Sequence, residues 1–129
     1  MKLLFATLLT SLILLSSPAC TGLKNDFNKL TSIHDTIARA YKVNGISVNI
    51  HNNKYLNIGI TNTKYNKETN SRKQEMAIEI GKMVLALNAD STFEAGVVTF
   101  TQSNDYLIAN STSSESFDMM LDSLRHLPE

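Results

Sequence analysis

The residue types that most often carry catalysis or bind metals are few and scattered in this sequence. His34, His51 and His126 fall on separate segments, and neither a His-x-x-x-His nor a Cys-x-x-Cys spacing occurs. The single cysteine, Cys20, lies near the start, and no Gly-x-Ser-x-Gly turn is present to expose a nucleophilic serine. We therefore predict no metal site, no nucleophilic catalytic site and no cofactor.

The carboxylates give no better indication of catalysis. Glu75 and Glu79 are four residues apart and share one face of a predicted helix, but Arg72, Lys73 and Lys82 flank them, which is typical of a solvated charged face. The sequence thus favours a non-catalytic binding or accessory protein. The alternative is a small secreted enzyme or enzyme inhibitor whose site is assembled from loops.

Positive charge is concentrated on the loop that enters the second predicted helix. Such a cluster predicts binding of an anion or a lipid headgroup. Glu68 and Glu75 lie close by, so a merely solubilising loop is the alternative. The candidate anion-binding residues are Lys64, Lys67, Arg72 and Lys73.

A second candidate surface is the polar side of the first predicted hairpin. Its uncharged hydrogen-bonding side chains would suit a glycan or a partner protein, although many antiparallel sheets simply expose one polar face to water. The residues of this candidate binding face are Ser47, Asn49, His51, Tyr55, Asn57 and Thr61.

Composition and charge describe an ordinary globular chain. It has 129 residues, of which 43% are hydrophobic and 19% charged, and its formal net charge is zero. This length suits one domain with one core. The balanced charge gives no indication of a nucleic-acid partner.

The first 19 residues have the order of a signal peptide. Lys2 precedes an apolar stretch that ends in small residues, and its run of about a dozen apolar residues is shorter than the roughly 20 that span a bilayer. We therefore predict export, with residues 1–19 removed, residues 20–25 as a short tether and residues 26–129 as the folded domain.

The junction Ser16-Ser17-Pro18-Ala19-Cys20 resembles the lipobox of bacterial lipoproteins. This resemblance implies that Cys20 is lipidated, becomes the new N-terminus and holds the protein to a membrane of the cell envelope. The alternative is ordinary cleavage after the small residues of the Ser17-Pro18-Ala19 site, which would release a soluble periplasmic or secreted protein.

Hydrophobic periodicity predicts the order helix, hairpin, helix, hairpin, helix. The first helix starts at Asp26, with an apolar stripe that includes Phe27 and Ala40, and the second follows the polar loop at residues 62–70 and ends in residues 88–92. In the first hairpin, Ile46, Val48 and Ile50 alternate with polar residues. Pairing these three with Ile60, Ile58 and Leu56 places all six on one face, with residues 52–54 at the tip.

The second half of the chain is predicted by the same rules. Residues 96–101 and 106–109 form a hairpin with its tip at residues 103–105, residues 111–116 form a polar loop, and Phe117 to Leu127 form the last helix, capped by Ser114 or Ser116. The fold class is therefore α+β, with a four-stranded, mainly antiparallel sheet and helices on one face. The hairpins share residues at an offset of 51, as in Gly45 and Gly96, which suggests an internal duplication or merely similar turns.

Overall fold

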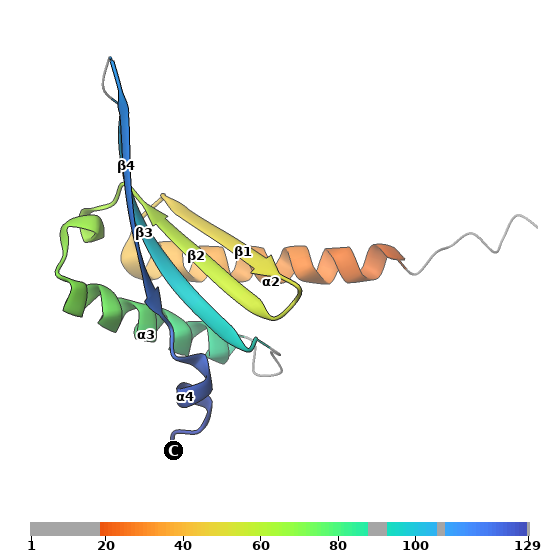
Figure 1. Ribbon diagram of the computed structural model, residues 1–129. Helices are drawn as coiled ribbons and strands as arrows, with labels where there is room; N and C mark the ends of the chain where they lie inside the picture. The colour runs from red at the N-terminus through yellow and green to blue at the C-terminus, as the bar shows by residue number, and fades with distance from the viewer. Residues whose placement is uncertain (1–18, 88–92, 106–107, 129) are drawn as a thin grey trace, which may run out of the picture.

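The structure is a two-layer α+β domain, seen in a computed structural model that describes residues 19–87, 93–105 and 108–128. One four-stranded sheet carries helices on one face (Figure 1). The predicted fold class and element order are confirmed. The elements are α2 (Ala19–Tyr41), β1 (Ile46–His51), β2 (Tyr55–Thr61), η2 (Lys64–Lys67), α3 (Asn70–Leu87), β3 (Ala95–Asp105), β4 (Asn110–Asp118) and α4 (Leu121–Arg125).

The strands lie in the order β1-β2-β3-β4. Both hairpins are antiparallel, and the central pair, β2 and β3, is parallel. A parallel pair needs a crossover, which α3 supplies between β2 and β3. The sheet is therefore mixed, with two antiparallel pairs and one parallel pair.

Helix α2 begins earlier than predicted. The predicted signal peptide lies outside the described residues except for Ala19, but the predicted tether at residues 20–25 is part of the helix. Gly22 is the poorest helix former in that stretch, and one glycine costs a helix only about 1 kcal/mol. The first turns of α2 extend beyond the sheet (Figure 1), so Phe27 is 68% exposed and not buried as predicted. Ala40 is also exposed.

The first hairpin has the predicted register. Ile46 pairs with Ile60, Val48 with Ile58, and Ile50 with Leu56. At the tip, Asn52 and Asn53 both adopt positive φ angles, 53° and 57°, a conformation that asparagine tolerates better than most residues. The strict apolar and polar alternation thus determines which face of the hairpin packs against the helices.

The core lies between the sheet and helices α2 and α3. The last three turns of α2 bury Ile33 and Ile37, and α3 buries Ile80 and Val84, although Leu87 is 41% exposed. The predicted end of the α3 helix at residues 88–92 lies outside the described residues. The buried apolar residues are Ile33, Ile37, Tyr41, Val43, Leu56, Ile58, Ile60, Met76, Ala77, Ile80, Val84, Phe93, Val98, Phe100, Met119 and Leu121.

The second hairpin is longer than predicted. Residues 103–105, expected at the tip, belong to β3, and residues 111–116, expected in a loop, belong to β4. Of the predicted second strand, residues 106–107 lie outside the described residues. No glycine or proline interrupts residues 97–117, and paired hydroxyls join the strands. Thr99 lies 3.0 Å from Ser116, and Thr101 lies 3.0 Å from Ser114, between their oxygen atoms.

The last helix is shorter than predicted. Phe117 belongs to β4, where its ring meets Phe100 edge to face at 5.8 Å. Met120 takes a left-handed conformation at the start of α4, and its N–H donates to Asp118 Oδ1 at 2.6 Å. The predicted caps Ser114 and Ser116 instead pair within the sheet. The chain therefore turns sharply after β4 before it forms one short helix.

The sheet topology argues against an internal duplication. The two hairpins can be compared with their first strands, β1 and β3, pointing the same way and with the helix-covered face of the sheet toward the viewer. Because β2 and β3 are parallel neighbours, β2 then lies on one side of β1, whereas β4 lies on the other side of β3. No rotation superimposes these arrangements. The offset of 51 also maps inward Val48 onto outward Thr99. The shared residues are better explained as similar turns.

Candidate functional site

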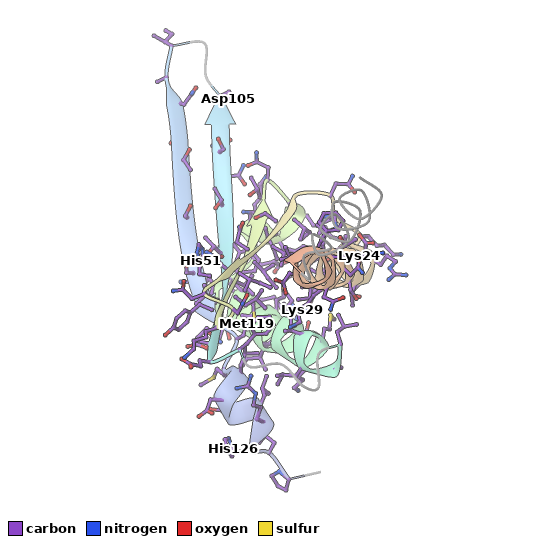
Figure 2. The ribbon with its side chains drawn as sticks, turned by 90° about the vertical axis from the view of Figure 1, so that its right-hand side faces the viewer. Lys24, Lys29, His51, Asp105, Met119 and His126 are labelled. Atoms are coloured by element: carbon purple, nitrogen blue, oxygen red, sulfur yellow. The ribbon has the colours of Figure 1, made fainter. Side chains whose placement is uncertain are left out.

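The side of the sheet that faces away from the helices carries mostly polar side chains. Figure 2 shows helices α2 and α3 on one side of the sheet and His51 at the other side. Here we call this side the outward sheet face. It comprises Ser47, Asn49, His51, Tyr55, Asn57, Gly59, Thr61, Val97, Thr99, Thr101, Ser114 and Ser116, with Asp118 at the end of β4.

The structure brings the six predicted binding-face residues together on this surface. His51 pairs with Tyr55 and Asn49 pairs with Asn57, so their side chains lie next to each other on adjacent strands. All of the six are exposed except Asn57, which is half-buried.

The second hairpin extends the outward sheet face in a way that the sequence analysis missed. The Thr99 hydroxyl bridges Ser116 on β4 at 3.0 Å and Asn57 on β2 at 3.4 Å. These contacts form a hydrogen-bonded row across three strands. The signal that could have revealed it is the alternation of Thr99, Thr101 and Ser103 with the core residues Val98 and Phe100.

One end of the outward sheet face is slightly hollowed. A shallow depression of about 260 Å³ lies beside the Tyr55 ring, with Ala95 and Val97 forming much of its apolar floor. Glu94 lies near the Tyr55 hydroxyl, and Lys54 Nζ lies 2.6 Å from Glu94 Oε1. The hydrogen bond between them raises the pKa of Lys54 and lowers the pKa of Glu94. The two charges cancel, so this end of the face carries little net field.

The predicted anion-binding loop is divided by the structure. Lys64 lies 5.0 Å from the centre of the Tyr65 ring, and Arg72 lies 3.2 Å from Glu75 and 3.1 Å from Glu79, measured between charged atoms. Only Lys67 and Lys73 line a common pocket. The four residues therefore do not form one continuous site.

Arg72 belongs to a network that ties α2 to α3. The Tyr41 hydroxyl donates to Glu79 at 2.7 Å, and Arg72 donates to the other carboxylate oxygen. Burial, followed by the hydrogen bond to Glu79, raises the pKa of Tyr41 well above its ordinary value. The hydrogen bond from Tyr41, supported by Arg72, lowers the pKa of Glu79. These shifts reflect contact between the helices and lie away from the outward sheet face.

The three histidines remain apart in space. His34 Nδ1 contacts Asp35 at 3.0 Å, His51 lies on the outward sheet face, and His126 Nδ1 lies 2.8 Å from the Asp122 carbonyl oxygen. Within residues 19–87, 93–105 and 108–128, no group of three or more potential metal ligands comes together.

Helix α2 contains Cys20 in its first turn. None of the described helices combines the length and apolar character needed to cross a membrane.

No family model matches the chain, and neither a curated protein nor a solved structure matches it.

Proposed function

We propose that the chain is a small exported lipoprotein of the cell envelope that acts as a non-catalytic binding module. Cys20 would carry the lipid, and the outward sheet face would contact a partner protein. The observation that carries the proposal is the face itself, an array made mostly of hydroxyl and amide side chains that no described helix covers.

The chemistry of the outward sheet face suits a protein partner. Serine, threonine and asparagine both donate and accept hydrogen bonds, and Tyr55 adds an amphipathic ring that is 47% exposed. Antibody binding surfaces rely on a similar mixture of tyrosine, serine, glycine and asparagine. A flat surface of this composition can adapt to another flat surface through direct and water-mediated hydrogen bonds.

The size of the outward sheet face predicts weak, reversible binding. Four strands about 4.8 Å apart and the seven residues of β2, at about 3.3 Å each, define an area of roughly 400 Å². A standard protein interface buries about 800 Å² on each partner. The contact would therefore belong among small, transient interfaces.

The position of Cys20 supports an anchor that leads directly into the domain. From Cys20 to Ile33, the first core residue of α2, the helix rises roughly 20 Å. A lipid on Cys20 would then hold the domain at a short distance from the membrane by a helical stem, whereas the sequence predicts a short tether before the helix. This arrangement would limit its partners to proteins at or near the membrane surface.

The anchor is tested by labelling with palmitate and by membrane fractionation. We expect label on the chain and none on the Cys20→Ala variant, which should leave the membrane fraction. A Cys20→Ala variant that stays fully membrane-associated would contradict the lipid anchor.

The binding surface is tested by affinity purification from envelope extracts, followed by binding measurements with the purified partner. Asn49→Lys places a charge in the middle of the face and should abolish that binding. Ala86→Lys adds the same charge at an exposed position on α3 and should leave it intact. Equal binding by both variants would exclude the outward sheet face. If a neutral glycan competed for the outward sheet face, the ligand of this face would be a carbohydrate and not a protein.

A further inference from the structure

A pocket on the helix side of the sheet lies beneath the projecting part of the second hairpin. Strands β3 and β4 continue beyond Thr61, the last residue of β2, and project past the rest of the molecule, with Asp105 near the end of β3 (Figure 2). The 3-10 helix η2 and the start of α3 lie below them. The pocket has a volume of about 370 Å³ and is lined by Asn66, Lys67, Lys73, Phe100, Gln102, Asn104, Ser113 and Glu115.

Lys73 is the central feature of this pocket. The residue is 5% exposed, so most of its side chain is buried. Its Nζ lies 2.5 Å from Glu115 Oε2 and 5.7 Å from the centre of the Phe100 ring. Glu115 is the one hydrogen-bond acceptor that it has among the described residues. An ammonium group has three donors, so Lys73 retains hydrogen-bonding capacity toward the pocket.

The pocket carries a net positive charge. Lys67, on η2, is exposed and forms no ion pair within the described residues. With Lys73 and Glu115, the formal charges of the lining residues sum to plus one. A singly charged anion would balance this charge. A multiply charged anion would leave an excess of negative charge beside Glu115 and would therefore be less favourable.

Neutral polar groups complete the lining. Gln102 Nε2 donates to Asn104 Oδ1 at 3.4 Å, which is long for a hydrogen bond, and Ser113 faces them from β4. Asn66 differs, because its amide is already bonded to the Ile60 and Thr101 carbonyls. Gln102, Asn104 and Ser113 can therefore bond a ligand, while Asn66 holds η2 in place.

We infer that this pocket binds a small monocarboxylate that carries several hydroxyl groups, such as a uronic acid. Its carboxylate would pair with Lys67 and Lys73, and its hydroxyls would bond Gln102, Asn104 and Ser113. The volume lies at the lower end of the roughly 300 to 1,000 Å³ of small-molecule sites, which suits a single sugar ring. The inference is independent of the outward sheet face, because the pocket opens on the opposite side of the sheet.

The test is a titration of the isotope-labelled full chain with D-glucuronate, followed by two-dimensional NMR. Chemical-shift changes should concentrate at the amides of Lys73, Gln102, Asn104 and Ser113. D-glucose, which has the hydroxyls without the carboxylate, should produce no saturable change. Sulfate, which has charge without the sugar hydroxyls, should bind on the order of tenfold more weakly than glucuronate.

Two lysines on η2 provide a matched pair of variants. Lys67→Gln should weaken glucuronate binding roughly five- to tenfold, because it removes one charged hydrogen bond. Lys64→Gln removes an equal charge outside the pocket and should leave the affinity unchanged. Both positions are exposed, so neither variant should impair folding.

Three outcomes would overturn the inference. One is no saturable shift with glucuronate, and another is equal weakening by Lys67→Gln and Lys64→Gln. The third is sulfate or glucose binding as tightly as glucuronate, which would show that the site does not recognise the carboxylate and the hydroxyls together.

Discussion

The two hairpins of the sheet differ in how far apolar residues extend along them. In β1 and β2, every inward position is apolar, from Ile46 to Ile60. In β3 and β4, the inward residues are apolar only near the helices, at Val98, Phe100 and Phe117. Beyond them the inward side chains are polar, and the hairpin projects past the rest of the molecule along the direction of its strands (Figure 2).

The part of the sheet that stabilises the domain therefore differs from the part that is available for contact with a ligand or partner. Burial of apolar side chains is the main stabilising contribution in a domain of this size, so the first hairpin and the base of the second should determine the free energy of unfolding. The projecting part contributes little burial. It extends the outward sheet face on one side and forms the roof of the Lys73 pocket on the other.

The largest expected effect is in the first hairpin. Ile58→Ala removes a fully buried side chain from the centre of the core and should lower the free energy of unfolding by about 3 to 4 kcal/mol. Thr112→Ala, in the exposed part of β4, should change it by less than about 0.5 kcal/mol. Urea denaturation of both variants measures the contrast, and similar losses would refute the division into a stabilising and a projecting region.

The next effect concerns the attachment of the projecting region. The Asn66 amide donates to the Thr101 carbonyl at 2.8 Å and accepts from the Thr63 N–H at 2.8 Å. Asn66→Ala should therefore cost about 1 to 3 kcal/mol, because it removes the side-chain acceptor of the half-buried Thr63 N–H and leaves the Thr101 carbonyl with one donor fewer, that of the Asn62 N–H remaining. Hydrogen exchange should become faster at residues 101–103, while Asn110→Ala should leave those amides unchanged. Unaltered exchange in Asn66→Ala would mean that η2 does not hold the hairpin.

A smaller effect, dependent on pH, is expected where α2 meets α3 behind the first hairpin. The folded-state pKa of Glu79 lies below its ordinary value of 4.5, chiefly because Tyr41 donates to it. The resulting stabilisation is present above pH 4.5 and is lost as the pH falls through the lowered pKa. Glu79→Gln should therefore make stability less dependent on pH in that acidic range, measured by urea denaturation at several pH values. Glu68→Gln, an exposed residue outside the network, should retain the dependence of the unaltered chain.

The smallest expected effect on stability is on the outward sheet face. Thr99→Val removes the hydroxyl that bridges β2 and β4 but keeps a β-branched side chain, so it should cost no more than about 1 kcal/mol. Thermal unfolding measures this loss. A much larger loss would show that the hydroxyl row is part of the stabilising framework, and would weaken its assignment as a contact surface.

The same difference explains what could be predicted from the sequence. Strict alternation from Ile46 to Ile60 defined the strands, tip and register of the first hairpin, because one register alone buries all six apolar side chains. Residues 111–116 offer no such alternation, and their polar run predicts a loop, although hydroxyl pairs hold it as a strand. Lys73 was expected in a solvated cluster, because its partner Glu115 lies 42 residues away and only the fold brings them together.

The central claim, that the outward sheet face is the contact surface, is tested most directly by site-specific photo-crosslinking in intact cells that export the chain. A photoreactive residue at Asn49 lies in the middle of the face, and one at Lys82 lies on an exposed part of α3. We predict a discrete protein adduct from Asn49 that is absent from Lys82 and is lost when Asn57→Lys is added. Adducts of equal yield from both positions, or adducts from Lys82 alone, would contradict the claim.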